Sequence, residues 1–476
     1  MAVNIFSFVL MGVILYIIYS EKYLKKIYIK SLTLLVLIEM YIECGNFIDL
    51  GEFQVSYASL VEVYFCLLSL LIIVYSKCRI SRTLMSTILL LVFIMILGIL
   101  FIYIFPSSHK SGNSIVTWDM AINGASLQNI SYNPYMIKQM IQMIMFIIDV
   151  VAMSIVFTDK TFINIFTKFC SYTKCIVVTG YLEFSIKYVL KSNSFNAFTQ
   201  MFFGKTTQAY VSLLARGNGY MLQGFTKESS HYAYVLLISL IALTALNTIT
   251  KKEVKWILAV LFLMIFAMSF SSYYFIACYI LFLLFVKSLN GCTGKNIMKV
   301  ICLIIVIICL SMILITQVDR IHDSLSTTGF IGRRIVSVID TINLIINSNW
   351  LNNMNYLELS TRVRLGSIYE TLKLSLYRPI FGYGICAVTS HGSSTMILCG
   401  IGYIGSYLWF KMMIVKSKFI KIMDINGTLL IGVMYFIINL TNSLWLRPFY
   451  EMSAIICLYS MTILYNYKNR KDVTCD

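Results

Sequence analysis

Arginine side chains gather in one stretch of an otherwise apolar chain, STRVRLGSIYETLKLSLYRPIFGYG (Ser360–Gly384). The stretch contains Arg362, Arg364 and Arg378 but a single acidic residue, Glu370. A guanidinium group matches phosphate oxygens with two parallel hydrogen bonds. These residue types therefore indicate binding of an anionic, phosphate-containing ligand, provided that the fold holds them at one surface.

The same stretch predicts an amphipathic helix over residues 361–377. Apolar side chains recur with helical spacing at Leu365, Ile368, Leu372 and Leu376. Pro379 ends the helix, FGYG at 381–384 turns the chain, and His391 stands at the start of the next apolar segment. A helix at the lipid interface explains the apolar stripe, but it leaves the glycine turn and the histidine behind it unexplained.

A second polar cluster ends a shorter loop with the sequence LLARGNGYMLQGFTKESSHYAYV. Arg216 is followed by three glycines and then by Lys227, Glu228 and His231. Glycine lets the backbone approach a ligand closely and present its N–H groups to an anion. The alternative is a flexible loop that enters the membrane through an ordinary polar cap, and the residues favour neither interpretation.

The elements that carry these clusters are predicted to be transmembrane helices. The chain has 476 residues, 59% of them hydrophobic and 12% charged, with a mean hydropathy of +0.81, and a soluble domain cannot bury so much apolar surface. We expect one integral membrane domain over residues 1–476, an all-α polytopic bundle of about 12–14 spans, since no long stretch alternates as a membrane barrel would. Thirteen apolar spans can be drawn, at residues 3–20, 31–50, 55–76, 85–105, 136–157, 174–190, 231–249, 256–270, 272–286, 300–316, 394–412, 427–446 and 452–466.

Positive charge in every second connection orients these spans. Short connections rich in Lys and Arg stay in the cytosol, which places the N-terminus outside and the C-terminus in the cytoplasm. The alternate connections include the long loops 106–135, 191–230 and 317–393. The last two contain both polar clusters, so these arginines lie on the extracytoplasmic side, against the usual bias, and need a reason other than topology.

The remaining composition excludes several kinds of site. The net charge of +17 comes largely from the predicted cytosolic loops, where membrane orientation explains it, so no nucleic acid partner is expected. The 13 cysteines form no CxxC pair and no Cys/His cluster. Neither a disulfide framework nor a metal site is therefore predicted.

Both polar clusters resemble motifs of bacterial O-antigen polymerases (Wzy-type), members of the O-antigen polymerase/ligase superfamily. RGNGYMLQGFTKESSHYA resembles an outer-loop motif in which an arginine precedes a glycine and then an acidic residue before a helix. The region from Ser360 to Phe410 looks like a motif shared with O-antigen ligases, with an arginine, an amphipathic helix, Pro-x-x-Gly-x-Gly and a histidine that opens a helix. The matching positions are Arg362, Pro379, Gly382, Gly384, His391, Gly402 and Gly405. The serine turn at 268–280 also matches in position, although the arginine usual after the serine is absent.

The resemblance implies a GT-C-like, metal-independent glycosyltransferase without a cofactor. Such an enzyme transfers a glycan from undecaprenyl pyrophosphate to another lipid-linked repeat unit at the outer face of the bacterial plasma (inner) membrane. The implied pyrophosphate-binding residues are Arg362, Arg364, Arg378 and Lys227. Arg216 would stabilise the leaving group, and either His391 or Glu228 would take the proton of the acceptor hydroxyl.

The expected partners follow from the same resemblance. They are the undecaprenyl-pyrophosphate-linked oligosaccharide and the lipid bilayer, with a chain-length regulator and a flippase as further protein partners. The product can be an O-antigen, a capsule or another exopolysaccharide.

Other functions remain open. An O-antigen ligase would transfer the finished glycan to the lipid A core, and a peptidoglycan polymerase of the same superfamily is a weaker alternative because the polar motif expected before an acid in its long outer loop is missing. A transporter would use ionisable residues within the spans, which are Glu39, Glu43, Glu62, Asp149 and Glu183. A purely structural protein would not need arginines placed against the orientation rule.

Overall fold

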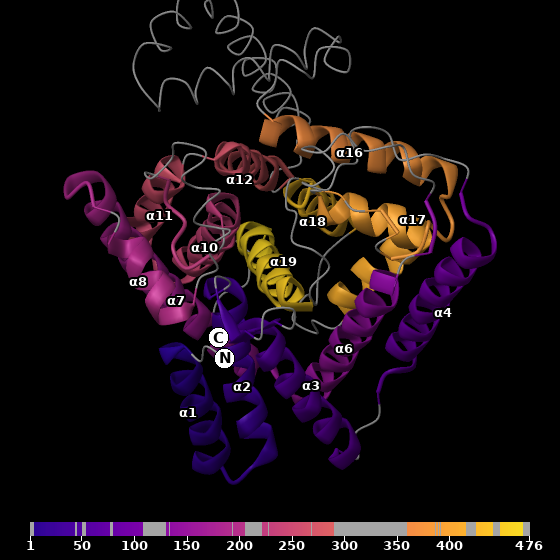
Figure 1. Cartoon of the computed structure of the whole chain (residues 1–476), viewed down its shortest axis with the longest axis horizontal. Helices are drawn as coiled ribbons and strands as arrows, with labels where there is room; N and C mark the ends of the chain where they lie inside the picture. Colours follow the sequence, from indigo (N-terminus) through magenta and orange to yellow (C-terminus); the bar gives the residue numbers. More distant parts are fainter. Residues whose placement is uncertain are drawn as a thin grey trace, which may run out of the picture.

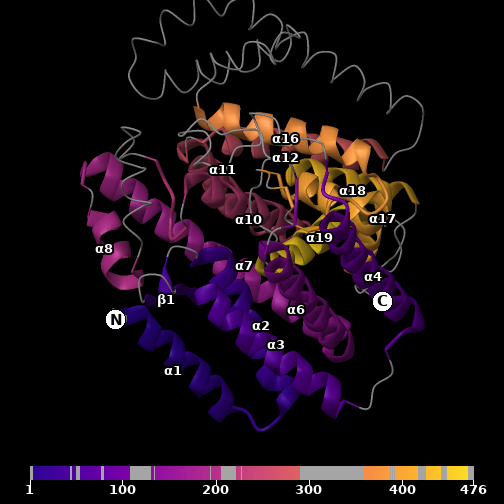
Figure 2. The same cartoon turned by 45° about the vertical axis from the view of Figure 1, so that its right-hand side comes forward.

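The computed structural model describes residues 4–42, 45–49, 54–76, 80–107, 130–132, 134–192, 194–204, 221–226, 228–267, 269–289, 359–385, 387–388, 390, 392–415, 425–440 and 448–469. Nearly all of them are helical, as the all-α prediction requires. In chain order the helices are α1 (Ile5–Ser20), α2 (Leu24–Tyr41), α3 (Tyr57–Tyr75), α4 (Arg82–Ile104), α6 (Pro134–Val156), α7 (Asp159–Phe184), the π-helix η1 (Ser185–Val189), α8 (Ser194–Phe203), α10 (Ser229–Thr250), α11 (Val254–Phe266), α12 (Phe270–Leu289), α16 (Leu359–Tyr377), α17 (Ser393–Val415), α18 (Ile425–Ile438) and α19 (Pro448–Asn469). Figures 1 and 2 show them as one bundle with α16 lying across one end, above α12 and α17.

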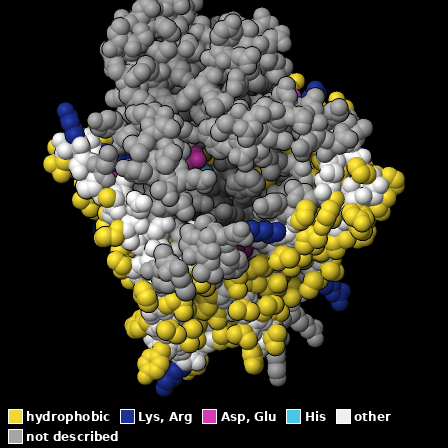
Figure 3. All heavy atoms as spheres, viewed as in Figure 1, with side chains coloured by type: hydrophobic (Ala, Val, Ile, Leu, Met, Phe, Trp, Pro, Cys, Tyr) yellow, Lys and Arg dark blue, Asp and Glu magenta, His cyan; other side chains and the backbone are white. Residues whose placement is uncertain are grey.

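Several helices have the length and composition of membrane spans. Within the described residues, five meet both criteria: α3, α4, α10 and most of α6 and α17. Shorter apolar helices are α1, α11 and parts of α12, α18 and α19. Hydrophobic side chains cover the lower part of the described surface in Figure 3. Large apolar side chains left exposed on α1, α3 and α4 fit a lipid-facing surface, so the chain is a membrane protein.

The predicted spans coincide with helices in most places. The separation of spans 256–270 and 272–286 is confirmed, but its position is not: α11 ends at Phe266 and α12 begins at Phe270, so the expected break at Ser271 lies inside α12. The expected span 174–190 is the second half of a longer helix, because α7 already begins at Asp159. The expected span 300–316 lies outside the described residues.

The prediction of one span over residues 31–50 is wrong at its end. Helix α2 stops at Tyr41, and the chain then forms a small antiparallel hairpin of β1 (Asn46–Asp49) and β2 (Gln54–Ser56). Glycines at 45 and 51 and the polar residues between them favour a turn over a helix. Apolar composition alone does not distinguish the last turns of a helix from a short strand.

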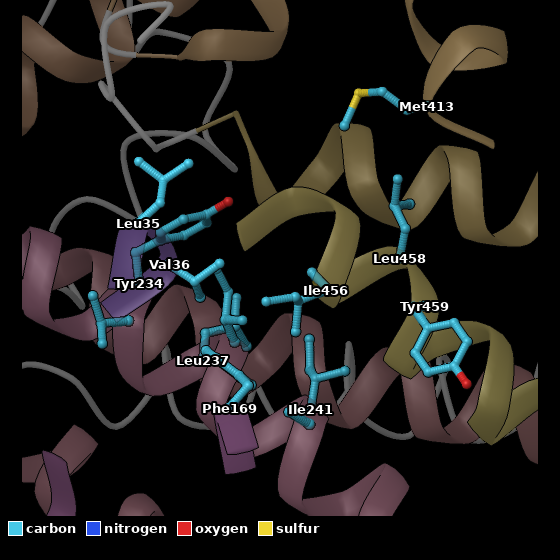
Figure 4. Close-up of a cluster of buried hydrophobic side chains, with 14 of the residues drawn as sticks. Leu35, Val36, Phe169, Tyr234, Leu237, Ile241, Met413, Ile456, Leu458 and Tyr459 are labelled. Carbon is cyan, nitrogen blue, oxygen red and sulfur yellow. The ribbon is translucent and has the colours of Figure 1, made fainter. Parts of the chain in front are cut away.

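Helix α10 is the centre of the core. It is buried on nearly all sides from Tyr232 to Leu243, and in Figure 1 it lies in the middle of the bundle beside α19. Figure 4 shows Leu237 and Ile241 of α10 close to Phe169 of α7 and Ile456 of α19. A helix that is apolar all round in this way must be surrounded by other helices.

Polar connections gather at the two ends of the bundle. At one end the Asn4 amide donates to the backbone carbonyls of Asn46 (3.1 Å) and Phe203 (3.4 Å). At the other end Lys174 of α7 forms an ion pair with Glu253, 2.9 Å away, in the α10–α11 connection. Helices that cross a membrane in alternating directions must place their connections at its two sides. Which end of the bundle faces the cytosol stays a prediction.

Candidate functional site

The structure describes only part of the predicted site. Arg216, Lys227 and His391 lie outside the described residues. Arg362 and Arg364 lie near the start of α16, where the backbone is described. Glu228 and Arg378 are described with their side chains.

Helix α16 forms where the sequence predicts a helix over 361–377, but it buries a different face. Its inner side combines Leu374, 4% exposed, with the hydroxyl-bearing residues Ser367, Thr371 and Ser375, all at most 1% exposed. Leu376 of the expected apolar stripe is instead 69% exposed. Small side chains let α16 pack closely on α17, where the hydroxyls of Ser375 and Tyr403 lie 3.3 Å apart. The most deeply buried residues of α16 are therefore not those of the expected apolar stripe, of which Ile368 and Leu372 are only partly buried.

Arg378 joins the end of α16 to two neighbours. Its Nη2 donates to the backbone carbonyl of Phe105 at 3.0 Å, just beyond α4, and its guanidinium carbon lies 4.9 Å from the ring centre of Tyr383. Burial raises the pKa of the Tyr383 phenol, so that ring stays neutral under the guanidinium. One arm of Arg378 thus already has a protein partner, and its expected role in phosphate binding would fall to the remaining N–H groups.

The FGYG turn docks into a break in α17. Gly402, with φ of 69°, interrupts the helix. Backbone N–H groups of Tyr383 and Gly384 donate to the carbonyls of Cys399 (2.8 Å) and Gly400 (2.9 Å), and Tyr403 N donates to the Pro379 carbonyl at 2.7 Å. Backbone groups that the break frees are satisfied by the turn, as burial within a membrane protein requires.

Two glycines make this docking possible. A Cβ on Gly402 would lie 2.7 Å from the Pro379 carbonyl oxygen, and one on Gly382 would lie 2.5 Å from that of Cys399. Both residues also have positive φ, which a side chain disfavours. On its other side the turn touches α4, because a Cβ on Gly98 would lie 3.0 Å from the Phe381 carbonyl oxygen. The Pro-x-x-Gly-x-Gly spacing therefore anchors the C-terminal end of α16, through a turn that contacts both α4 and α17.

The loop before α10 ends in a set of short hydrogen bonds around Glu228. The Thr226 hydroxyl bridges the backbone carbonyls of Gln223 (2.7 Å) and Glu228 (2.9 Å), and Ser230 Oγ donates to the Glu228 carboxylate at 3.2 Å. Glu228 directly precedes the first turn of α10, where the helix dipole favours a negative charge. The half-buried Glu228 is thus held in one position at the N-terminus of α10. A candidate base needs such a fixed position.

Asn439, at the end of α18, joins the two motif regions. Its side-chain oxygen accepts from Tyr234 of α10 (3.3 Å) and from Ser393 of α17 (3.4 Å). Ser393 follows His391 by two residues, and Tyr234 follows Glu228 by six, less than two helical turns. The beginnings of α10 and α17, which follow the loops 191–230 and 317–393, are therefore linked through Asn439, although 159 residues separate Tyr234 from Ser393 in sequence.

Sequence reasoning missed three residues that organise this end of the bundle. Asn439 is only 4% exposed but carries no motif that marks it. Glu183 was noted only as an ionisable residue for transport, and Lys187, four residues later, was not noted at all. Glu183 and Lys187 form an ion pair. An acidic and a basic residue four positions apart within an apolar helical segment are the sequence signal that could have identified it.

Asp149, the other acid considered for transport, belongs to a separate network among α2, α3 and α6. Ser69 Oγ donates to its carboxylate at 2.6 Å, and the Tyr28 hydroxyl donates to its backbone carbonyl at 3.4 Å. Asp149 is thus hydrogen-bonded to side chains of the neighbouring helices α2 and α3. Among the described residues, no group of His, Cys, Asp and Glu could hold a metal ion.

Comparison with known proteins does not narrow these possibilities. No protein-family model matches the chain, and neither a curated protein nor a solved structure matches it.

Proposed function

We propose that this chain is a metal-independent membrane glycosyltransferase that polymerises lipid-linked repeat units. It would transfer a glycan from undecaprenyl pyrophosphate to a sugar hydroxyl of another lipid-linked unit at the outer face of the membrane. The observation that carries the proposal is the meeting of the two motif regions at Asn439. A two-substrate transfer needs a phosphate-binding region and a base within reach of one another.

The proposed glycosyl transfer gives each candidate residue a role. The acceptor hydroxyl gives its proton to Glu228 or His391 while its oxygen bonds to the anomeric carbon of the donor. The bond from that carbon to the pyrophosphate breaks, and the leaving group takes the electron pair. Arg216, Arg362 and Arg364 would stabilise the negative charge that develops there. The position of α16 across one end of the bundle supports this assignment, because the pyrophosphate of a lipid-linked donor would lie at the membrane surface.

The test is inactivation of the gene in its host, followed by gel analysis of the surface glycan. We expect the ladder to collapse to a single repeat unit, and Arg216→Ala, Arg362→Ala and His391→Ala to fail to restore it at normal protein levels. Lys411→Ala is the matched control, since it removes a cation from the opposite end of α17. It should restore the full ladder.

Two other outcomes would replace the proposal. Long polymer that remains on its lipid carrier would identify the ligase. An unchanged ladder would exclude both enzymes, and a phenotype that follows Asp149→Asn would then indicate transport, for which the buried Asp149–Ser69 network is the specific observation.

A further inference from the structure

A buried ion pair lies at the end of α7 that adjoins loop 191–230. Glu183 Oε1 and Lys187 Nζ are 2.6 Å apart, and their side chains are 0% and 1% exposed. Lys187 belongs to the π-helix η1, which widens the helix at this point. Such π-helical turns are rare and frequently occur at functional sites.

Both members of the pair bind the backbone of one loop segment, Met221–Thr226. The Glu183 carboxylate accepts hydrogen bonds from the N–H groups of Gln223 (3.2 Å to either oxygen) and Gly224 (2.7 Å). Lys187 donates to the Met221 carbonyl at 2.9 Å. The charges thus satisfy backbone groups of the loop as well as each other.

Neighbouring contacts extend this arrangement to α8 and α10. The Gln223 side-chain amide donates to Asn196 of α8 at 3.0 Å. Gly224, with φ of 53°, lies against the ring of Tyr232, so a Cβ there would be 2.8 Å from that ring. Thr226 then links the segment to the Glu228 carbonyl. A continuous chain of contacts therefore runs from the ion pair to Glu228.

A buried ion pair adds little net stability to a fold. The cost of removing two charges from water often equals or exceeds their attraction, and apolar residues of similar size frequently stabilise as well. What charged groups add is a defined geometry for the backbone groups that they bind. The pair therefore suits a segment that must keep one conformation.

We propose that Glu183 and Lys187 are positioning residues that fix Met221–Thr226 and thereby place Glu228 for catalysis. The catalytic part of this inference rests on the proposed glycosyltransferase function. The inference that the two residues fix the segment 221–226 does not depend on that function.

The first experiment measures amide hydrogen exchange in the full chain reconstituted in lipid nanodiscs. In Glu183→Gln, the amides of Gln223 and Gly224 should exchange about tenfold faster or more, because their charged acceptor is lost. The amides in the middle of α10 should be unchanged. Glu253→Gln, which breaks the ion pair at the opposite end of the bundle, is the matched control and should leave residues 221–226 unchanged. Unchanged exchange in Glu183→Gln would overturn the proposal.

The second experiment measures glycan elongation with a lipid-pyrophosphate-linked oligosaccharide. We expect Glu183→Gln to raise the apparent KM or lower kcat about tenfold, and Lys187→Arg, which keeps the positive charge, to retain more activity than Lys187→Met. Faster loop exchange with unchanged kinetic constants would overturn the catalytic part. Absence of elongation by the unaltered chain would refute the proposed function instead, while the exchange result would still decide whether the pair fixes the loop.

A third variant covers the case in which Glu183→Gln does not fold. Thr226→Val removes the hydroxyl that bridges Gln223 and Glu228 but leaves the ion pair intact. It should lower elongation while exchange at Gln223 and Gly224 stays slow. Full activity in Thr226→Val would contradict the path from the pair to Glu228.

Discussion

Two segments enter the bundle between helices, and the fold holds them by different means. The turn at 379–384 is held in α17 by backbone hydrogen bonds and by the missing side chains of glycines. The segment 221–226 is held on α7 by two charged side chains that bind its backbone. The first arrangement depends on volume and the second on charge, so the same kind of substitution should affect the two segments differently.

The largest loss of stability is expected when one charge of the buried pair Glu183–Lys187 is removed. Lys187→Met leaves the buried Glu183 carboxyl without its cationic partner, which should lower the free energy of unfolding by about 3–5 kcal/mol. The double variant Glu183→Gln/Lys187→Met removes both charges and should regain a large part of that loss. Equilibrium unfolding in mixed detergent micelles measures both. A double variant no more stable than Lys187→Met would show that charge pairing is not what holds this segment.

An intermediate effect is expected from added volume in the turn of α17. Gly402→Ala forces a side chain onto a residue with positive φ and against the Pro379 carbonyl, which should cost about 1–3 kcal/mol in the same unfolding assay. Gly12→Ala on α1 is the matched control, since a Cβ there meets no atom within 4 Å. Equal stability of the two variants would mean that the turn does not need a glycine at 402.

The smallest loss of stability is expected at an ion pair of similar length that is partly exposed to solvent. Glu21 and Lys30 lie 2.5 Å apart at the α1–α2 connection. The hydrogen bond from Lys30 lowers the pKa of Glu21, so the pair stabilises the fold above the ordinary pKa of a glutamate, and this contribution disappears as the pH falls through the lowered pKa. Water screens the charges, so Glu21→Gln should lower stability at pH 7 only slightly, by far less than Lys187→Met does.

An unfolding titration from pH 7 to pH 3, with and without Glu21→Gln, checks this expectation. The two curves should converge at the acidic end, where the carboxyl is protonated in both states. A large loss at pH 7 would show that exposure does not separate this pair from Glu183–Lys187.

Most helices could be predicted because the bilayer imposes a simple requirement. A span must be apolar for about 20 residues, and α10 accordingly begins and ends within two residues of the prediction. The helix at 361–377 was also predicted, from its spacing and from Pro379. Its buried face was not, because leucines can face lipid as well as protein, and the Ser367–Thr371–Ser375 face is used where close helix packing is needed.

The candidate site could be predicted only in part. Motif resemblance marked the two loops and the glycines of the turn, but a Gly-x-x-Gly pair is compatible with an unbroken helix. The break at Gly402 is stable because Pro379 and the N–H groups of Tyr383 and Gly384 satisfy the freed backbone groups, and these partners become neighbours only in the folded chain. Asn439 has no sequence signal for the same reason.

The sequence by itself determined that the chain is a helical membrane protein, where most of the described apolar helices lie and which connections carry positive charge. These properties follow from local composition, since each span must satisfy the bilayer separately. The tertiary structure alone decided that Asn439 joins the two motif regions, that the glycine turn fills a broken helix, and that Glu183 and Lys187 bind a loop more than thirty residues away. Those contacts depend on hydrogen-bond geometry between distant segments, which residue types do not encode until the helices pack.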